Sequence, residues 1–307
     1  MSYKISRCLD RFQFNYGDKC ALDVAKEVGV SGLDFSLLHY DVRKEGNLYT
    51  LTEEKIREYF RGVREYAEKI GIAIPQVHGR LYGFGIDEAG DEAFVRNSEL
   101  DCIAAHELGA KYCVVHTPAI TWVGDGHSDE EMFDISDRMF GAILPYAKRE
   151  GIKIAAETHG NSGKYQKMEF FGYVDNLIEC VRRAKALGDY ENSICICVDT
   201  GHTNMTVRYG NPTVDEVIRK LGDMVEVLHL HDNDGVTDQH KIPMTGTINW
   251  DEVIKAIKDV GFSGWYDLEN DITHFGEGFE KKEAIFSTQV IEQMLSLYDM
   301  GKPIKAF

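Results

Sequence analysis

The feature that most constrains the fold of this 307-residue chain is a repeated alternation of short β-rich runs with long amphipathic segments. This alternation predicts βα units whose strands join in one parallel sheet. Eight such units can be counted from one end of the chain to the other. The expected strands cover residues 4–8, 32–38, 73–78, 111–116, 153–157, 194–199, 225–231 and 265–269. Eight parallel strands with intervening helices predict a single (β/α)8 TIM barrel.

A helix is expected between the second and third of these strands, over residues 52–70. Apolar side chains recur there at intervals of three and four residues, which is the spacing of one helix face. They are Ile56, Phe60, Val63, Ala67 and Ile70, and Gly71 follows where a C-terminal cap belongs. The six prolines are dispersed and no linker rich in Pro, Gly or Ser divides the chain. Residues 1–307 are therefore expected to form one domain.

The composition argues against several partners and compartments. The 51 acidic residues outnumber the 34 basic ones, and the resulting formal charge of -17 disfavours a nucleic-acid partner, because phosphates are bound by Lys and Arg. The seven cysteines are scattered and lack a CxxC pair, which indicates reduced thiols. No signal-peptide core and no apolar run of about 18 residues is present, so no membrane partner is expected. The expected location is the cytoplasm.

Most of the expected strands end in a side chain that can bind a metal or move a proton. From the third strand onward these terminal residues are His78, His116, Glu157, Asp199, His231 and Glu269. In α/β barrels the carboxyl ends of the strands carry the active site, so these side chains are expected to converge. His229 lies one inward-facing position earlier than His231 and is interpreted as a core histidine.

Four of these residues make a candidate metal site: Glu157, Asp199, His231 and Glu269. Three carboxylates with one imidazole form an oxygen-rich ligand set. Such a set suits a divalent ion, with Mn2+ favoured and Mg2+, Co2+ or Zn2+ as alternatives.

The order of several motifs resembles the xylose isomerase-like TIM-barrel superfamily, which includes sugar isomerases and keto-sugar 3-epimerases. The motifs are AAETHGN, VDTGHTN, HLHDND, DQHKIPMTGTINW and YDLEN, and the resemblance spans roughly the whole chain. It implies that Glu157, Asp199, His231 and Glu269 bind one metal ion and that Glu157 and Glu269 are the catalytic proton-transfer pair. It also implies that His202 contacts substrate oxygens and that the protein forms a homo-oligomer.

The expected function is therefore isomerisation or epimerisation of a sugar or sugar phosphate through a metal-stabilised enediolate. A carbon beside a ketone loses its proton only when a base is near and the developing charge is stabilised. Two carboxylates on opposite sides would invert that carbon, whereas one base working on one face would interconvert aldose and ketose. A lyase that dehydrates an inosose-like keto compound, and a metal-binding barrel without turnover, remain alternatives.

Further histidines suggest a rival function. His78, His116, Asp238 and His240 also resemble the additional ligands of metal-dependent AP endonucleases, which bind three zinc ions in this fold. Two features argue against DNA repair. DTGHTN lacks the longer run that normally follows the Asp-x-x-His motif in those nucleases, and the charge of -17 opposes binding to duplex DNA. These residues are instead expected to line the substrate pocket, and His202, Asp238 and His240 could hold a second ion.

Two residues in the loops after the third and fourth strands complete the expected substrate site. Arg80 and Trp122 would supply a cation and an apolar face over a sugar ring.

Overall fold

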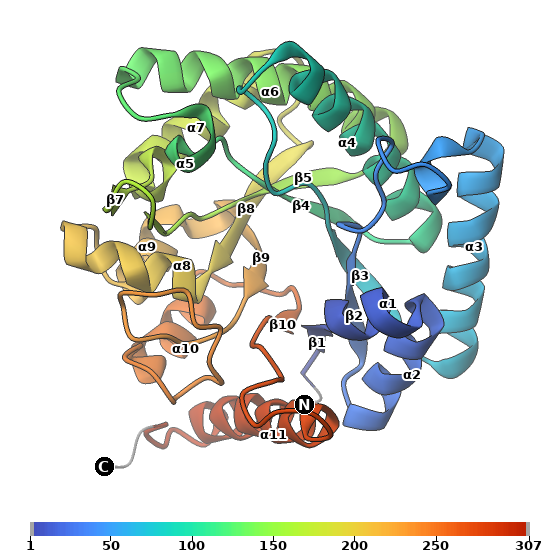
Figure 1. Ribbon diagram of the computed structural model, residues 1–307. Coiled ribbons are helices and arrows are strands. Elements are labelled where there is room, and N and C mark those ends of the chain that lie inside the picture. Colours follow the sequence, from blue (N-terminus) through green and yellow to red (C-terminus); the bar gives the residue numbers. More distant parts are fainter. Residues whose placement is uncertain (1–2, 305–307) are drawn as a thin grey trace.

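The computed structural model describes residues 3–304, and within this range eight parallel strands form one nearly closed barrel surrounded by helices (Figure 1). The strands are β1 (Ile5–Cys8), β2 (Gly32–Ser36), β3 (Ala73–His78), β4 (Tyr112–His116), β5 (Lys153–Glu157), β8 (Ile194–Asp199), β9 (Val225–His229) and β10 (Tyr266–Leu268). They follow the order β10-β1-β2-β3-β4-β5-β8-β9. The prediction of a (β/α)8 barrel is confirmed.

The barrel closes where β9 meets β10. The backbone N–H of Leu230 donates to the carbonyl of Asp267 at 2.8 Å, and the N–H of Glu269 donates to the carbonyl of Leu230 at 3.2 Å. All eight strands therefore direct their carboxyl ends toward one common opening, as the active-site face of this fold requires.

Helices cover the outside of the barrel. They are α1 (Asp10–Tyr16), α2 (Asp18–Val28), α3 (Glu53–Ile70), α4 (Glu88–Leu108), α5 (Ile120–Val123), α6 (Asp129–Glu150), α7 (Val174–Ala186), α8 (Thr200–Thr206), α9 (Val214–Leu221), α10 (Trp250–Asp259) and α11 (Glu280–Asp299). A short hairpin, β6 (Asn161–Ser162) and β7 (Lys167–Met168), follows β5. The apolar face predicted for α3 is buried, and Gly71 caps that helix with a φ of 82°.

The strand β9 ends two residues earlier than its apolar pattern predicts. Its last residue is His229, which lies opposite Asp199 in the parallel register with β8. Leu230 still pairs with β10, but the backbone of Asp232 pairs with Lys241 in both directions at 2.8 Å, so the chain leaves the barrel ladder after Leu230. This early end of β9 decides which histidine stands at the strand terminus.

The barrel interior is filled below the opening by small apolar side chains. They are Val114, Ala155, Cys195, Cys197 and Val227. A larger apolar core lies between the strands and the surrounding helices. The seven cysteines, all within residues 3–304, are free thiols, and no helix in that range is long and apolar enough to cross a membrane.

Candidate metal centre

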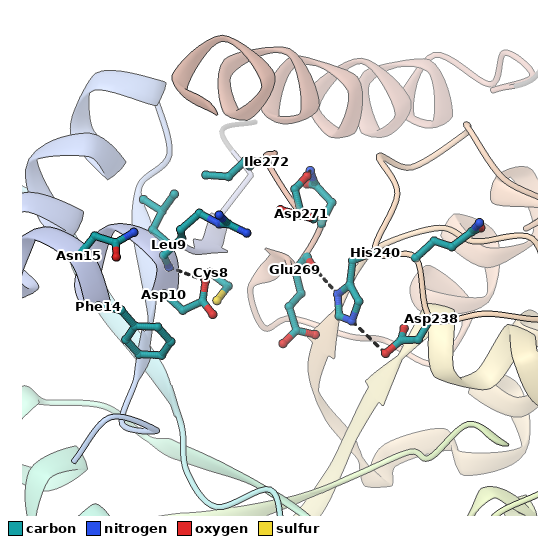
Figure 2. Close-up of a pocket in the computed structure, with 13 residues that line it drawn as sticks. Cys8, Leu9, Asp10, Phe14, Asn15, Asp238, His240, Glu269, Asp271 and Ile272 are labelled. Atoms are coloured by element: carbon teal, nitrogen blue, oxygen red, sulfur yellow. Dashed lines mark hydrogen bonds and ion pairs between the residues drawn. The ribbon is translucent and has the colours of Figure 1, made fainter. Parts of the chain in front are cut away.

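A cavity of about 540 Å3 opens beside the carboxyl ends of β1 and β10 (Figure 2). Glu269 points into it from the residue after β10, and Asp238 and His240 face Glu269 from the loop that follows β9. Asp10 and Phe14 line the opposite wall, at the start of α1. This space is called the first cavity below.

Four side chains converge at the strand ends: Glu157, Asp199, His229 and Glu269. One ligand atom from each lies within 4.8 Å of the corresponding atoms of the other three. Glu157, Asp199 and His229 are the last residues of β5, β8 and β9, and Glu269 follows β10 directly. Three carboxylates and one imidazole form a ligand set that suits a divalent cation.

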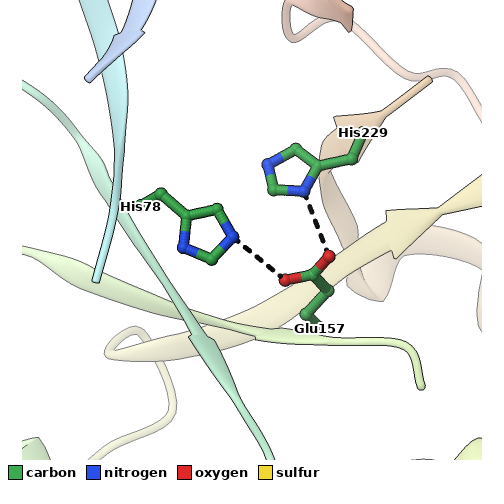
Figure 3. Close-up of side chains that lie close together, drawn as sticks. All are labelled: His78, Glu157 and His229. Atoms are coloured by element: carbon green, nitrogen blue, oxygen red, sulfur yellow. Dashed lines mark hydrogen bonds and ion pairs between the residues drawn. The ribbon is translucent and has the colours of Figure 1, made fainter. Parts of the chain in front are cut away.

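The imidazole in this group belongs to His229, and this corrects the sequence interpretation of His229 as a core histidine. Its Nδ1 lies 3.1 Å from Glu157 Oε1 and 3.2 Å from Glu269 Oε2. Figure 3 shows His229 and His78 on either side of the Glu157 carboxylate. His231, the residue predicted for this role, has its Nε2 2.9 Å from Asp199 Oδ2 and belongs to another group of potential ligands, with His240 and Glu269. The physical reason is the early end of β9 described above.

The Glu157 carboxylate is buried among imidazoles. His116 Nε2 lies 3.0 Å and His78 Nε2 lies 3.5 Å from Glu157 Oε2. Burial alone would raise the pKa of Glu157, but the charges of His116 and His229 hold it well below the ordinary value. For His78, burial is opposed by the Glu157 carboxylate, which raises the histidine pKa to about 9. Glu157 is therefore held as an anion.

Unsatisfied oxygens at this centre fit a cation. Glu157 Oε2 and Glu269 Oε2 are buried and have no hydrogen-bond partner of good geometry among residues 3–304. Imidazole nitrogens of His116 and His229 lie 3.0 and 3.2 Å away but outside hydrogen-bond geometry, and a buried polar atom without a hydrogen bond costs about 1–3 kcal/mol. A divalent ion between the two carboxylates would remove that cost, so the residues present fit a metal ion.

Asp34 lies behind His229 and was not foreseen from the sequence. Its Oδ2 accepts a hydrogen bond from Gln76 Nε2 at 3.2 Å and lies 3.2 Å from His229 Nε2. Both Asp34 and His229 are fully buried. A carboxylate behind a ligating imidazole fixes the ring and increases its basicity. An aspartate within the apolar run GLDFSLL was the available signal.

A second group of potential ligands lies next to the first and consists of His202, Asp238 and His240. Asp238 Oδ2 lies 3.3 Å from His202 Nε2 and 3.2 Å from His240 Nε2. Burial opposes the effect, but the Asp238 carboxylate raises the pKa of His240 to about 10. His240 Nδ1 donates to the Glu269 carbonyl at 2.8 Å, and this fixes its ring next to the first group.

The loop between β9 and α10 is held in place by Asp232. Its carboxylate accepts from the indole Nε1 of Trp250 at 2.8 Å and from the backbone N–H of Ile248 at 3.2 Å. Gly246 passes so close that a Cβ there would lie 2.2 Å from the carbonyl oxygen of Asn233. The close approach requires a glycine at position 246, and Ile248 and Trp250 supply the hydrogen bonds that hold the loop carrying Asp238 and His240.

A second cavity of about 410 Å3 opens beside β4, β5 and β8. His116 and His202 line its inner wall, and Trp122 and Tyr82 line its outer part. Asp238 lines both cavities. The two groups of potential ligands therefore lie between two open spaces.

The sequence matches the family model described as the xylose isomerase-like TIM barrel over residues 22–286. The chain belongs to this family. The uncharacterized protein MJ1311 of Methanocaldococcus jannaschii is 27% identical over 215 residues, which cover 66% of this chain and 64% of that protein. The match thus spans just under two thirds of that relative's length.

Solved structures with the same fold cover nearly the whole chain. A D-tagatose 3-epimerase-like protein has a TM-score of 0.71 at 19% identity, covering 98% of this chain and 99% of its own. The IOLI protein, solved with a bound zinc atom, has a TM-score of 0.73 at 18% identity, covering 96% of this chain and 99% of its own. At these identities the similarity shows the shared barrel.

Within this family barrel, Arg80 does not reach the metal centre. Its Nε lies 2.7 Å from Asp101 Oδ2, and its Nη1 donates to the Tyr40 carbonyl at 2.9 Å. The guanidinium is buried, so Arg80 packs inside the protein beneath the loop that follows β3. The expectation that Arg80 supplies a cation to the substrate is corrected by this placement. Trp122, in contrast, lines the second cavity, and it stacks on Tyr82 with ring centroids 4.5 Å apart.

His159 is a further buried residue at the second cavity that the sequence analysis missed. Its Nε2 lies 3.1 Å from the Thr117 carbonyl. Burial, together with the charges of His116 and His202, lowers the pKa of His159 to about 3, so this ring is neutral. The signal was its place in the motif AAETHGN, directly after a strand end.

Proposed function

We propose that this protein is a divalent-metal-dependent isomerase or epimerase of a keto sugar, which transfers a proton at the carbon beside the carbonyl group. The observation that carries the proposal is the pair Glu157 and Glu269. These carboxylates come from β5 and from the end of β10, and both approach His229 Nδ1, at 3.1 and 3.2 Å. Two carboxylates around one centre are what proton removal and return require.

The two glutamates differ in their access to the substrate. The Glu269 side chain is 14% exposed and lines the first cavity, whereas the Glu157 side chain is 1% exposed and lies beneath His116 and His202. Glu269 is therefore the base that meets a substrate entering the first cavity. Glu157 exchanges its proton on the side of the second cavity, where His116 lies 3.0 Å away.

The stereochemical outcome depends on how the two carboxylates share the proton. If Glu269 removes it and Glu157 relays a proton from the neighbouring His116 imidazole to the opposite face, the carbon is inverted. If one carboxylate carries it to the neighbouring carbon on the same face, an aldose and a ketose are interconverted. When bound, a divalent cation supplies the positive charge that stabilises negative charge developing on the carbonyl oxygen.

Several findings support a metal ion here. The ligand set of three carboxylates and one imidazole favours Mn2+, with Mg2+, Co2+ and Zn2+ as alternatives. A zinc atom is bound in the IOLI structure, and another protein of this fold is described as D-tagatose 3-epimerase-like. His240 lines the first cavity and His202 the second, and both are proposed to contact substrate hydroxyl groups, with Asp238 between them.

Deuterium incorporation tests the proposal. Metal-loaded protein is incubated in D2O with a panel of ketoses and inososes, and the recovered compounds are analysed by NMR. We expect deuterium at the carbon next to the carbonyl for at least one compound, and loss of this exchange in Glu269→Gln. Glu226→Gln, a change at the opposite end of the barrel, is the matched control.

Three results would contradict the proposal. Full deuterium exchange by Glu269→Gln would show that Glu269 is not needed for proton transfer. Release of water with an absorbing enone product would identify a dehydratase instead. Absence of exchange with every compound, from protein that binds the metal, would favour a barrel without turnover.

A further inference from the structure

We propose that the substrate is an unphosphorylated keto sugar joined to a second ring, and that this second ring binds in the second cavity against Trp122. The inference rests on the proposed function and names its substrate class. It comes from the size, position and lining of the two cavities.

The two cavities lie on either side of the catalytic carboxylates. Glu269 lines the first cavity. His116 and His202 line the second, and they lie 3.0 and 3.5 Å from the oxygens of Glu157. A substrate whose reacting carbon lies beside Glu157 and Glu269 therefore borders both spaces.

One sugar ring cannot fill both spaces. A hexose has about twelve non-hydrogen atoms, so even at the roughly 30 Å3 that a water molecule takes in the liquid it would occupy at most about 360 Å3. The first cavity, about 540 Å3, and the second, about 410 Å3, each exceed this value. Ligand sites bury most of the ligand surface, so a single ring would leave one cavity filled with water.

The outer part of the second cavity offers a flat aromatic surface. Trp122 and Tyr82 stack at 4.5 Å with an interplanar angle of 22°, and their residues are 44% and 45% exposed. The Tyr82 ring packs edge-on against His116, with centroids 5.4 Å apart. A line of rings thus runs from the outer rim to the imidazole that contacts Glu157. Aromatic faces bury large areas at little entropic cost and pack against the C–H face of a sugar ring.

The aromatic surface is fixed in place by a buried carboxylate. Glu169 accepts hydrogen bonds from the backbone N–H groups of Ile120, at 2.5 Å, and Thr121, at 3.2 Å, which form the first turn of α5. This ties α5, and with it Trp122, to the hairpin after β5. A preorganised surface loses less freedom on binding, so it favours a ligand that reaches it.

The charges around the first cavity argue against a phosphate group on the substrate. The first cavity is lined by the carboxylates of Asp10, Asp238, Glu269 and Asp271 and by two basic side chains, those of Arg11 and His240. The second is lined by Glu169 and Asp238, by the imidazoles of His116, His159 and His202, and by Arg208, whose guanidinium lies over the Tyr209 ring at 5.2 Å. Carboxylates repel a phosphate dianion, whereas they accept hydrogen bonds from sugar hydroxyl groups.

Binding and turnover together test the inference. Metal-loaded protein is titrated by calorimetry with 3-ketoglucose, with its 6-phosphate, and with a set of 3-keto-disaccharides of different linkage. The same compounds are then assayed for deuterium exchange. We expect at least one keto-disaccharide to bind 10-fold or more tightly than 3-ketoglucose, and the phosphate ester to bind more weakly than 3-ketoglucose.

Variants of the aromatic surface provide the control. Trp122→Ala should bring the ratio of disaccharide to monosaccharide affinity down to about one, whereas Trp122→Phe should retain most of it. Phe286→Ala, an exposed aromatic on α11 outside both cavities, should leave the ratio unchanged.

The outcomes separate this inference from the proposed function. Equal affinity for one-ring and two-ring compounds, or an affinity ratio that Trp122→Ala does not change, would overturn the two-ring substrate, even if exchange is observed. Tighter binding of the phosphate ester would overturn it as well. A two-ring preference that depends on Trp122, without exchange of any compound, would support the second-ring site and refute the isomerase.

Discussion

Replacing His229 and, separately, His231 distinguishes the group of potential metal ligands found in the structure from the ligand set that the sequence pattern predicts. His229 lies between Glu157 and Glu269, whereas His231 contacts Asp199 and stacks on His240 with centroids 3.9 Å apart. We therefore expect His229→Asn to weaken binding of Mn2+ far more than His231→Asn.

The size of the effect follows from the number of ligands. A site with four protein ligands can contribute about 10–16 kcal/mol, so one ligand accounts for roughly 3 kcal/mol, or about a 100-fold change in Kd. His231 lies outside the four-residue group, and a residue next to the ligands changes metal affinity by about 10-fold at the lower limit. The loss of affinity in His229→Asn should therefore exceed that in His231→Asn by up to about tenfold.

Competition with a fluorescent chelator at pH 7.5 measures both affinities. Thermal unfolding in EDTA shows whether each variant folds without metal, which separates a lost ligand from a lost fold. A larger loss of affinity in His231→Asn than in His229→Asn would refute the assignment of His229.

Three further predictions concern the surroundings of the site and the opposite end of the barrel. Asp34→Asn should weaken metal affinity about 10-fold without changing the number of ions bound, because Asp34 lies 3.2 Å from His229 Nε2; calorimetry checks this. Burial would raise the pKa of Glu226, but Lys153 lowers it below the ordinary 4.5, so the stability that it contributes is present above pH 4.5 and lost as the pH falls further. Glu226→Gln should therefore lower the free energy of unfolding by about 1–2 kcal/mol at pH 7. It should also make this free energy fall less steeply as the pH drops below 4.5, as measured by urea unfolding. Gly246→Ala should destabilise the protein by about 1–3 kcal/mol, because its Cβ would lie 2.2 Å from a backbone oxygen; an unchanged melting temperature would contradict this.

The barrel could be predicted from the sequence because its signals are local. The helix spacing of Ile56, Phe60 and Val63 and the alternation of strands with helices depend only on residues near one another in the chain. Glu157 and Asp199 could also be placed at their strand ends, because an apolar run stops at each of them.

The sequence could not decide between His229 and His231, because both lie on the same face of a strand and only the strand's end distinguishes them. That end is set by backbone pairing of Asp232 with Lys241, which turns the chain away from the barrel after Leu230 and which no local pattern reveals.

The same limit applies to Arg80. Its partner Asp101 lies on α4, 21 residues later, so only the packed structure shows that this guanidinium turns away from the substrate.

The central claim is that Glu157, Asp199, His229 and Glu269 hold the metal ion at which the two glutamates act. An anomalous difference map from crystals soaked in Mn2+ tests this most directly. The account predicts a strong peak within bonding distance of all four side chains, with any second peak at His202, Asp238 and His240. A strong peak only at that second group, or one bounded by His231 in place of His229, would contradict it.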